Sequence, residues 1–114
     1  MTLKDIVDKL GTRVETAEEG LQQEVTGGYV SDLLSDVMAQ SKEGDIWITL
    51  QTHPNIIAVA TLKELAGIII VQGRKPDEET IGKAKSENFP ILVSDLQAFE
   101  IVGRLYQMGI SGMR

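Results

Sequence analysis

The sequence contains no cysteine among its 114 residues. This absence excludes disulfides, zinc–thiolate centres and cysteine nucleophiles. The N-terminus also lacks the basic segment followed by an apolar stretch that marks a secretory signal. The longest apolar runs, Ile68–Val71 and Ile56–Ala60, are far shorter than the roughly 20 residues that cross a bilayer. We therefore expect a cytoplasmic protein that does not enter the membrane.

Positive charge and aromatic side chains are scarce. The chain has 17 acidic and 11 basic residues, which gives a formal net charge of -6, and only 4% of its residues are aromatic. An acidic chain repels a phosphate backbone, and no stripe of Lys or Arg interleaved with aromatic residues offsets that repulsion here. Nucleic acid is therefore not an expected partner.

Recognisable catalytic and cofactor-binding patterns are missing as well. The chain has no nucleophile beside a base, no metal-ligand cluster and no complete phosphate-binding loop. We therefore assign no catalytic residue, no metal and no cofactor from the sequence.

What the sequence does contain is the composition of one folded, water-soluble domain. Apolar residues make up 42% of the chain and charged residues 25%, which is typical of a globular domain of ordinary size. We expect residues 1–110 to form a single domain and residues 111–114 to form a flexible C-terminal tail.

Apolar spacing and turn residues predict alternating strands and helices. The predicted strands are a weak one at Arg13–Thr16, an extended segment at Glu24–Val30, then Ile46–Leu50, Ile68–Val71 and Ile91–Val93. The predicted helices begin at Thr2, at Ser31, at Thr52-His53-Pro54, at Asp77 and at a capping box formed by Ser94 and Gln97. The wholly apolar strand Ile68–Val71 indicates cover on both faces, as in parallel sheets. The order therefore predicts an α/β fold, a three-layer sandwich with a mostly parallel sheet flanked by helices.

In such sheets, ligands bind beyond the carboxyl ends of the strands. The candidate residues there are Thr52, His53 and Arg74. His53 could bind phosphate or accept a phosphoryl group, or it could simply cap a helix. Arg74 could clamp a carboxylate or phosphate, or it could be an ordinary surface arginine.

A double glycine is the other candidate. Gly27 and Gly28 permit positive φ, so Thr26-Gly27-Gly28 could hold an anion ahead of a helix, or it could form a tight structural turn or bulge. If this turn converges with Thr52, His53 and Arg74, together they would bind a small phosphate-bearing ligand.

Self-association is also expected from the sequence. The domain is small, and its apolar surplus includes Trp47, Met108 and Ile110, which one small core is not expected to absorb. This reasoning predicts a homodimer.

Four segments in order resemble the DRTGG domain. They are Glu24-Val25-Thr26-Gly27-Gly28, Gly44-Asp45-Ile46-Trp47-Ile48-Thr49, Ala66-Gly67-Ile68-Ile69-Ile70 and Phe89-Pro90-Ile91-Leu92-Val93. The resemblance covers about Leu21 to Gly109. Only Thr26-Gly27-Gly28 matches the name motif literally, because Glu24 and Val25 stand where its acidic and arginine residues would be.

The resemblance implies a regulatory module. DRTGG domains are similar in fold to the N-terminal domain of the HPr serine kinase/phosphatase, and they occur in CBS-domain pyrophosphatases and some phosphotransacetylases without carrying those activities. It implies a domain that is frequently dimeric and has no catalytic residues to carry over. Our leading hypothesis is a non-catalytic regulatory or assembly module that self-associates and binds a small anionic metabolite or nucleotide at the strand ends. The alternatives are an enzyme or phosphocarrier using His53, and a protein-interaction scaffold whose partner is unknown.

Overall fold

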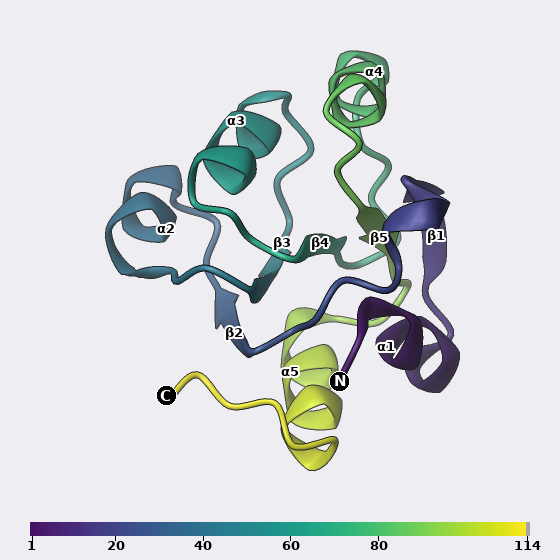
Figure 1. Cartoon of the computed structure of the whole chain (residues 1–114), viewed down its shortest axis with the longest axis vertical. Helices are drawn as coiled ribbons and strands as arrows, with labels where there is room; N and C mark the ends of the chain where they lie inside the picture. Colours follow the sequence, from purple (N-terminus) through teal and green to yellow (C-terminus); the bar gives the residue numbers. More distant parts are fainter. Residues whose placement is uncertain (114) are drawn as a thin grey trace.

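The computed structural model describes residues 1–113 and places a five-stranded sheet between two layers of helices (Figure 1). The strands are β1 (Arg13–Thr16), β2 (Gly27–Val30), β3 (Asp45–Thr49), β4 (Gly67–Ile70) and β5 (Ile91–Val93). The helices are α1 (Leu3–Leu10), α2 (Leu34–Gln40), α3 (Asn55–Leu62), α4 (Glu78–Ser86) and α5 (Ala98–Gln107), with a short 3₁₀ helix, η1, at Glu18–Gly20. Among these described residues no helix is both long and apolar enough to cross a membrane.

The strand order across the sheet is β1-β5-β4-β3-β2. Strands β2 to β5 run parallel, and β1 pairs with β5 in the antiparallel direction. Helices α2, α3 and α4 cover one face, and α1 and α5 cover the other (Figure 1). The predicted three-layer α/β sandwich with a mostly parallel sheet is therefore confirmed.

The core has one cluster on each face of the sheet. Because neighbouring residues of a strand point to opposite faces, Ile46 and Ile48 pack toward α1 and α5 while Trp47 packs toward α2 and α3. The Trp47 ring is fully buried, and its Nε1 donates to the Ser31 carbonyl at 2.9 Å. Trp47 and Ile110 are thus absorbed by the chain's own core, and the expectation that they form an apolar surplus is wrong.

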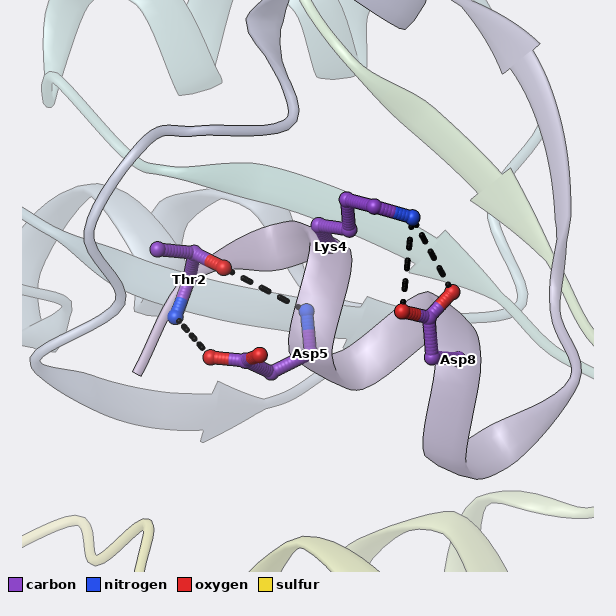
Figure 2. Close-up of polar contacts among 4 residues, drawn as sticks. All are labelled: Thr2, Lys4, Asp5 and Asp8. Atoms are coloured by element: carbon purple, nitrogen blue, oxygen red, sulfur yellow. Dashed lines mark hydrogen bonds and ion pairs between the residues drawn. The ribbon is translucent and has the colours of Figure 1, made fainter.

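Helix α1 is held by local signals (Figure 2). The Thr2 hydroxyl accepts from the Asp5 backbone N–H at 3.3 Å, and an Asp5 carboxylate oxygen accepts from the Thr2 N–H at 2.9 Å. This capping box starts the helix, and Gly11, in the left-handed conformation with φ 66°, ends it. Lys4 and Asp8 form an ion pair on the exposed side at 3.3 Å.

Two predicted helix starts are wrong. Helix α2 begins at Leu34 rather than at Ser31, because the Ser31 N–H still donates to the Ile48 carbonyl of β3 and the backbone stays extended at Leu33. Helix α5 begins at Ala98 without the predicted capping box, since the Ser94 hydroxyl accepts from Leu96 N–H instead.

Candidate functional site

The carboxyl ends of β3 and β4 bring two of the predicted polar loops together. The Thr52 carbonyl, three residues after β3, accepts from the Asp77 N–H at 3.1 Å and from the Thr80 hydroxyl at 2.6 Å. These bonds join the loop after β3 to the start of α4, just beyond the loop that carries Arg74. Thr52, His53 and Arg74 therefore lie at the same end of the sheet, beyond the carboxyl ends of its parallel strands, as the sequence predicts. We call this end of the sheet the polar edge.

His53 caps the helix that follows it. Its Nδ1 accepts from the Asn55 N–H at 3.0 Å, and the ring is exposed. Among residues 1–113 no hydrogen bond joins the ring to another titratable side chain. The helix-capping alternative describes this histidine, and the geometry does not supply a positioned acid or base.

Arg74 is an exposed cation at this end of the strands, and the exposed Lys75 follows it. Arg74 follows Gly73, which has φ 64°, and it forms no ion pair with any described residue. Arg13, by contrast, is paired with Asp95 at 3.2 Å and Arg104 with Glu100 at 3.0 Å. The Arg74 guanidinium is therefore available to an anion.

Carboxylates share the same edge. Asp32 Oδ1 accepts from the Thr49 hydroxyl at 2.8 Å and from the Leu50 N–H at 2.7 Å, so Asp32 closes the end of β3. Asp77 and Asp95 follow β4 and β5. These negative charges oppose anion binding, so any phosphate here depends on close contacts to Arg74 and to backbone amides.

The double glycine lies at the opposite end of the strands, where β2 and β3 begin. Gly27 pairs with Asp45 at the start of β3, whereas Thr52 and His53 follow the end of that strand. Strands β2 and β3 are parallel, so the start of β2 cannot reach the carboxyl ends of its neighbours. The predicted convergence of Thr26-Gly27-Gly28 with Thr52, His53 and Arg74 is wrong.

The double glycine is also not a turn. Gly27 and Gly28 are extended residues of β2, and neither has a positive φ. The predicted anion-holding loop before a helix is therefore wrong, because the two peptides belong to a strand ladder.

An apolar groove that sequence reasoning missed lies at the β2 edge of the sheet. It has a volume of about 260 Å³. Its floor is β2 and Ile48, one wall is α5 at Val102 and Tyr106, and its end is the segment Ile110–Gly112. A Cβ added to Gly28 would lie 3.5 Å from Ile110 Cγ2, so the missing side chain at Gly28 helps to leave this space open. Gly28 was the only hint of this groove that the sequence offered. The residues that complete the groove with it, on α5 and after it, are distant in the sequence.

Tyr29 lies beside the groove but turns its ring to the other face of the sheet. Its phenol donates to Asp36 Oδ2 at 2.8 Å. This hydrogen bond to a carboxylate, assisted by partial burial, raises the pKa of Tyr29 above its ordinary value of 10.0. The phenol therefore stays protonated and anchors β2 to α2.

The fold is a three-layer α/β sandwich with polar loops beyond the carboxyl ends of its parallel strands and an apolar groove beside β2. A family model for the DRTGG domain matches residues 5–108. The chain belongs to the DRTGG domain family, which confirms the resemblance seen in the sequence. No curated protein sequence matches it.

One similar solved structure holds the CBS and DRTGG domains of the regulatory region of Clostridium perfringens pyrophosphatase, complexed with its activator, diadenosine tetraphosphate. The two share 21% sequence identity with a TM-score of 0.71. The match covers 97% of this chain and 48% of the other, so this chain spans about half the length of its structural relative. At this identity the likeness establishes the fold.

Proposed function

We propose that the chain is a non-catalytic, cytoplasmic regulatory module that self-associates as a homodimer. The observation that carries this proposal is the apolar groove at an open strand edge, because such surfaces on soluble domains mark contacts with partners. The use of His53 as a helix cap supports a module rather than an enzyme or phosphocarrier.

Sedimentation equilibrium tests the self-association. We expect a species of twice the 12.5 kDa chain mass at micromolar concentration. A single 12.5 kDa species at high micromolar concentration would refute the homodimer.

We further propose that the polar edge at Thr52, His53 and Arg74 binds a small phosphate-bearing ligand, with a nucleotide as the first candidate. The unpaired Arg74 and the nucleotide held by the pyrophosphatase regulatory region support this choice. The sequence assigned Thr26, Gly27 and Gly28 to the same site. We no longer propose them as contacts, because they lie at the opposite end of the strands.

A thermal-shift series with inorganic phosphate, ATP and diadenosine tetraphosphate tests this ligand site. At 100 times its dissociation constant, a ligand stabilises the fold by about 2.7 kcal/mol. We expect Arg74→Ala to abolish the shift, while Arg104→Ala, an arginine already paired with Glu100, keeps it. A shift of the same size in Arg74→Ala would remove Arg74 from the site, and no shift with any of these compounds would favour the scaffold alternative.

A further inference from the structure

Strand β2 is an open edge of the sheet. Ser31 donates to the Ile48 carbonyl of β3, and the peptide groups of a parallel ladder face its neighbour at every second residue. Tyr29 therefore turns its peptide groups toward β3, while Gly28 and Val30 turn theirs outward. These two residues offer two donors and two acceptors to a further strand.

The edge strand β1 is protected from pairing with another chain, whereas the edge strand β2 is not. Strand β1 carries the charged residues Arg13 and Glu15, and its pairing with β5 is interrupted by a register shift between Val14 and Thr16. Charges and bulges of this kind prevent a sheet edge from pairing with another chain. Strand β2 has the sequence Gly27-Gly28-Tyr29-Val30, without a charge, a proline or a bulge, and its Val30 side chain is 50% exposed.

We propose that two copies of this chain join through β2, antiparallel, about a two-fold axis that passes between the two Tyr29 residues. This inference rests on the proposed self-association and assigns it to a surface. In this register Gly28 of one copy stands opposite Val30 of the other, and each such pair exchanges two backbone hydrogen bonds. A two-fold contact is self-complementary, so the same strand satisfies both partners. The two five-stranded sheets become one continuous sheet.

The side chains around β2 fit this arrangement. Residues directly opposite each other in an antiparallel pair point to the same face, and Gly28 and Val30 both lie on the face of the groove. The exposed Val30 of one copy therefore lies over Gly28 of the other, at the groove that Ile110 and Gly112 border on that side. An apolar side chain meets an apolar hollow on both sides of the axis.

The local charge also suits a second copy. Each chain has a net charge of -6, yet none of the ten residues that line the groove is Asp, Glu, Lys or Arg. On the groove face, two acidic chains can therefore meet without bringing like charges into contact. A phosphate-bearing ligand would find no cation among these groove residues, which favours a second copy over a nucleotide as the occupant.

The lack of cysteine allows a direct test of the register by disulfide formation. In the proposed pairing the two Tyr29 residues form a non-hydrogen-bonded pair, with Cα atoms about 4.5 Å apart, which lies within the range that a disulfide bridges. We expect Tyr29→Cys to cross-link to a covalent dimer under mild oxidation. Val30→Cys is the matched control: it is more exposed, but its symmetry mate is displaced by two positions along the strand, so it should remain largely monomeric on denaturing gels.

A second variant keeps the test valid if the cysteine disturbs β2. Val30→Lys places a charge on the open edge at a half-exposed position, and it should weaken the dimer at least about tenfold in sedimentation equilibrium, because the contact would bury an unpaired ammonium. Leu62→Lys, at a 69% exposed position of α3, should leave the dimer intact. A parent dimer with equal affinity in Val30→Lys would overturn the β2 contact and leave self-association standing. A monomeric parent would overturn both.

Discussion

At the scale of single residues, the contact between Thr26 and Gly44 joins the segments that lead into β2 and β3. The Thr26 hydroxyl donates to the Glu43 carbonyl at 3.3 Å and packs over Gly44, which has φ 84°. A Cβ on Gly44 would overlap Thr26 Oγ1. Two of the four segments that resemble the family thus meet in one contact, and the close approach of Thr26 requires a glycine at position 44.

Replacing Gly44 tests this contact. Gly44→Ala should lower the free energy of unfolding by about 1–3 kcal/mol, because alanine is strained at positive φ and its methyl group collides with Thr26. Gly82→Ala is the control: Gly82 lies inside α4 with no atom within 4 Å of its added Cβ, so that change should stabilise the fold by about 0.5–1 kcal/mol. Urea denaturation of the two variants checks both signs, and a neutral Gly44→Ala would contradict this contact.

At the scale of elements, the capping box of α1 makes stability depend on pH. The Thr2 N–H, followed by the Thr2 hydroxyl, lowers the pKa of Asp5 below its ordinary value of 3.8. A lowered pKa in the folded state contributes stability that is present above 3.8 and is lost as the pH falls through the folded value.

Asp5→Asn isolates this contribution. The difference in unfolding free energy between the parent and Asp5→Asn should be largest near neutral pH and should shrink as the pH falls below 3.8. Thr2→Val removes only the hydroxyl, so it should cost about 1 kcal/mol at neutral pH and retain the dependence that comes from the Thr2 N–H. A difference that stays constant with pH would show that Asp5 does not cap α1 as a carboxylate.

Helix α5 carries apolar residues on two faces, so apolar spacing alone does not identify its buried face. Phe99, Val102 and Tyr106 are spaced as one face of the helix, yet Phe99 is 91% exposed and Tyr106 is 61% exposed. The buried face carries Ile101 and Leu105 instead. Both stripes have helical spacing, and the direction of the sheet relative to α5 decided which one was buried.

At the scale of the whole molecule, net charge gives the two proposed associations opposite responses to salt. Two copies at -6 repel each other over distances that salt screens, with a Debye length of about 10 Å at 0.1 M. Self-association should therefore strengthen as sodium chloride is raised, whereas phosphate binding at Arg74 should weaken.

Sedimentation equilibrium and ligand-induced thermal shifts over one salt series measure the two responses on the same sample. A dimer that dissociates as salt is added would indicate a contact built on opposite charges, in conflict with the uncharged β2 edge. Ligand binding that is insensitive to salt would indicate recognition by something other than the Arg74 guanidinium.

The sequence by itself determined the elements of this protein and the class of its fold. Capping residues placed α1, the apolar run at Ile68–Val71 predicted a buried parallel strand, and polar loops marked the ends of β3 and β4. These signals are local, because helix spacing, strand alternation and turn chemistry depend on residues close together in the chain.

Only the tertiary structure decided which of these features meet. Thr26-Gly27-Gly28 lies at the opposite end of the strands from Thr52 and Arg74 because β2 and β3 run parallel. The groove exists because Gly28 comes together beside β2 with Tyr106 and Ile110, which are distant from it in the sequence. The apolar strands predict the parallel direction, but strand order and the placement of α5 beside β2 are set by packing across the whole core, which no local pattern encodes. For that reason the residues that compose the polar edge could be predicted, and the groove and the open edge of β2 could not.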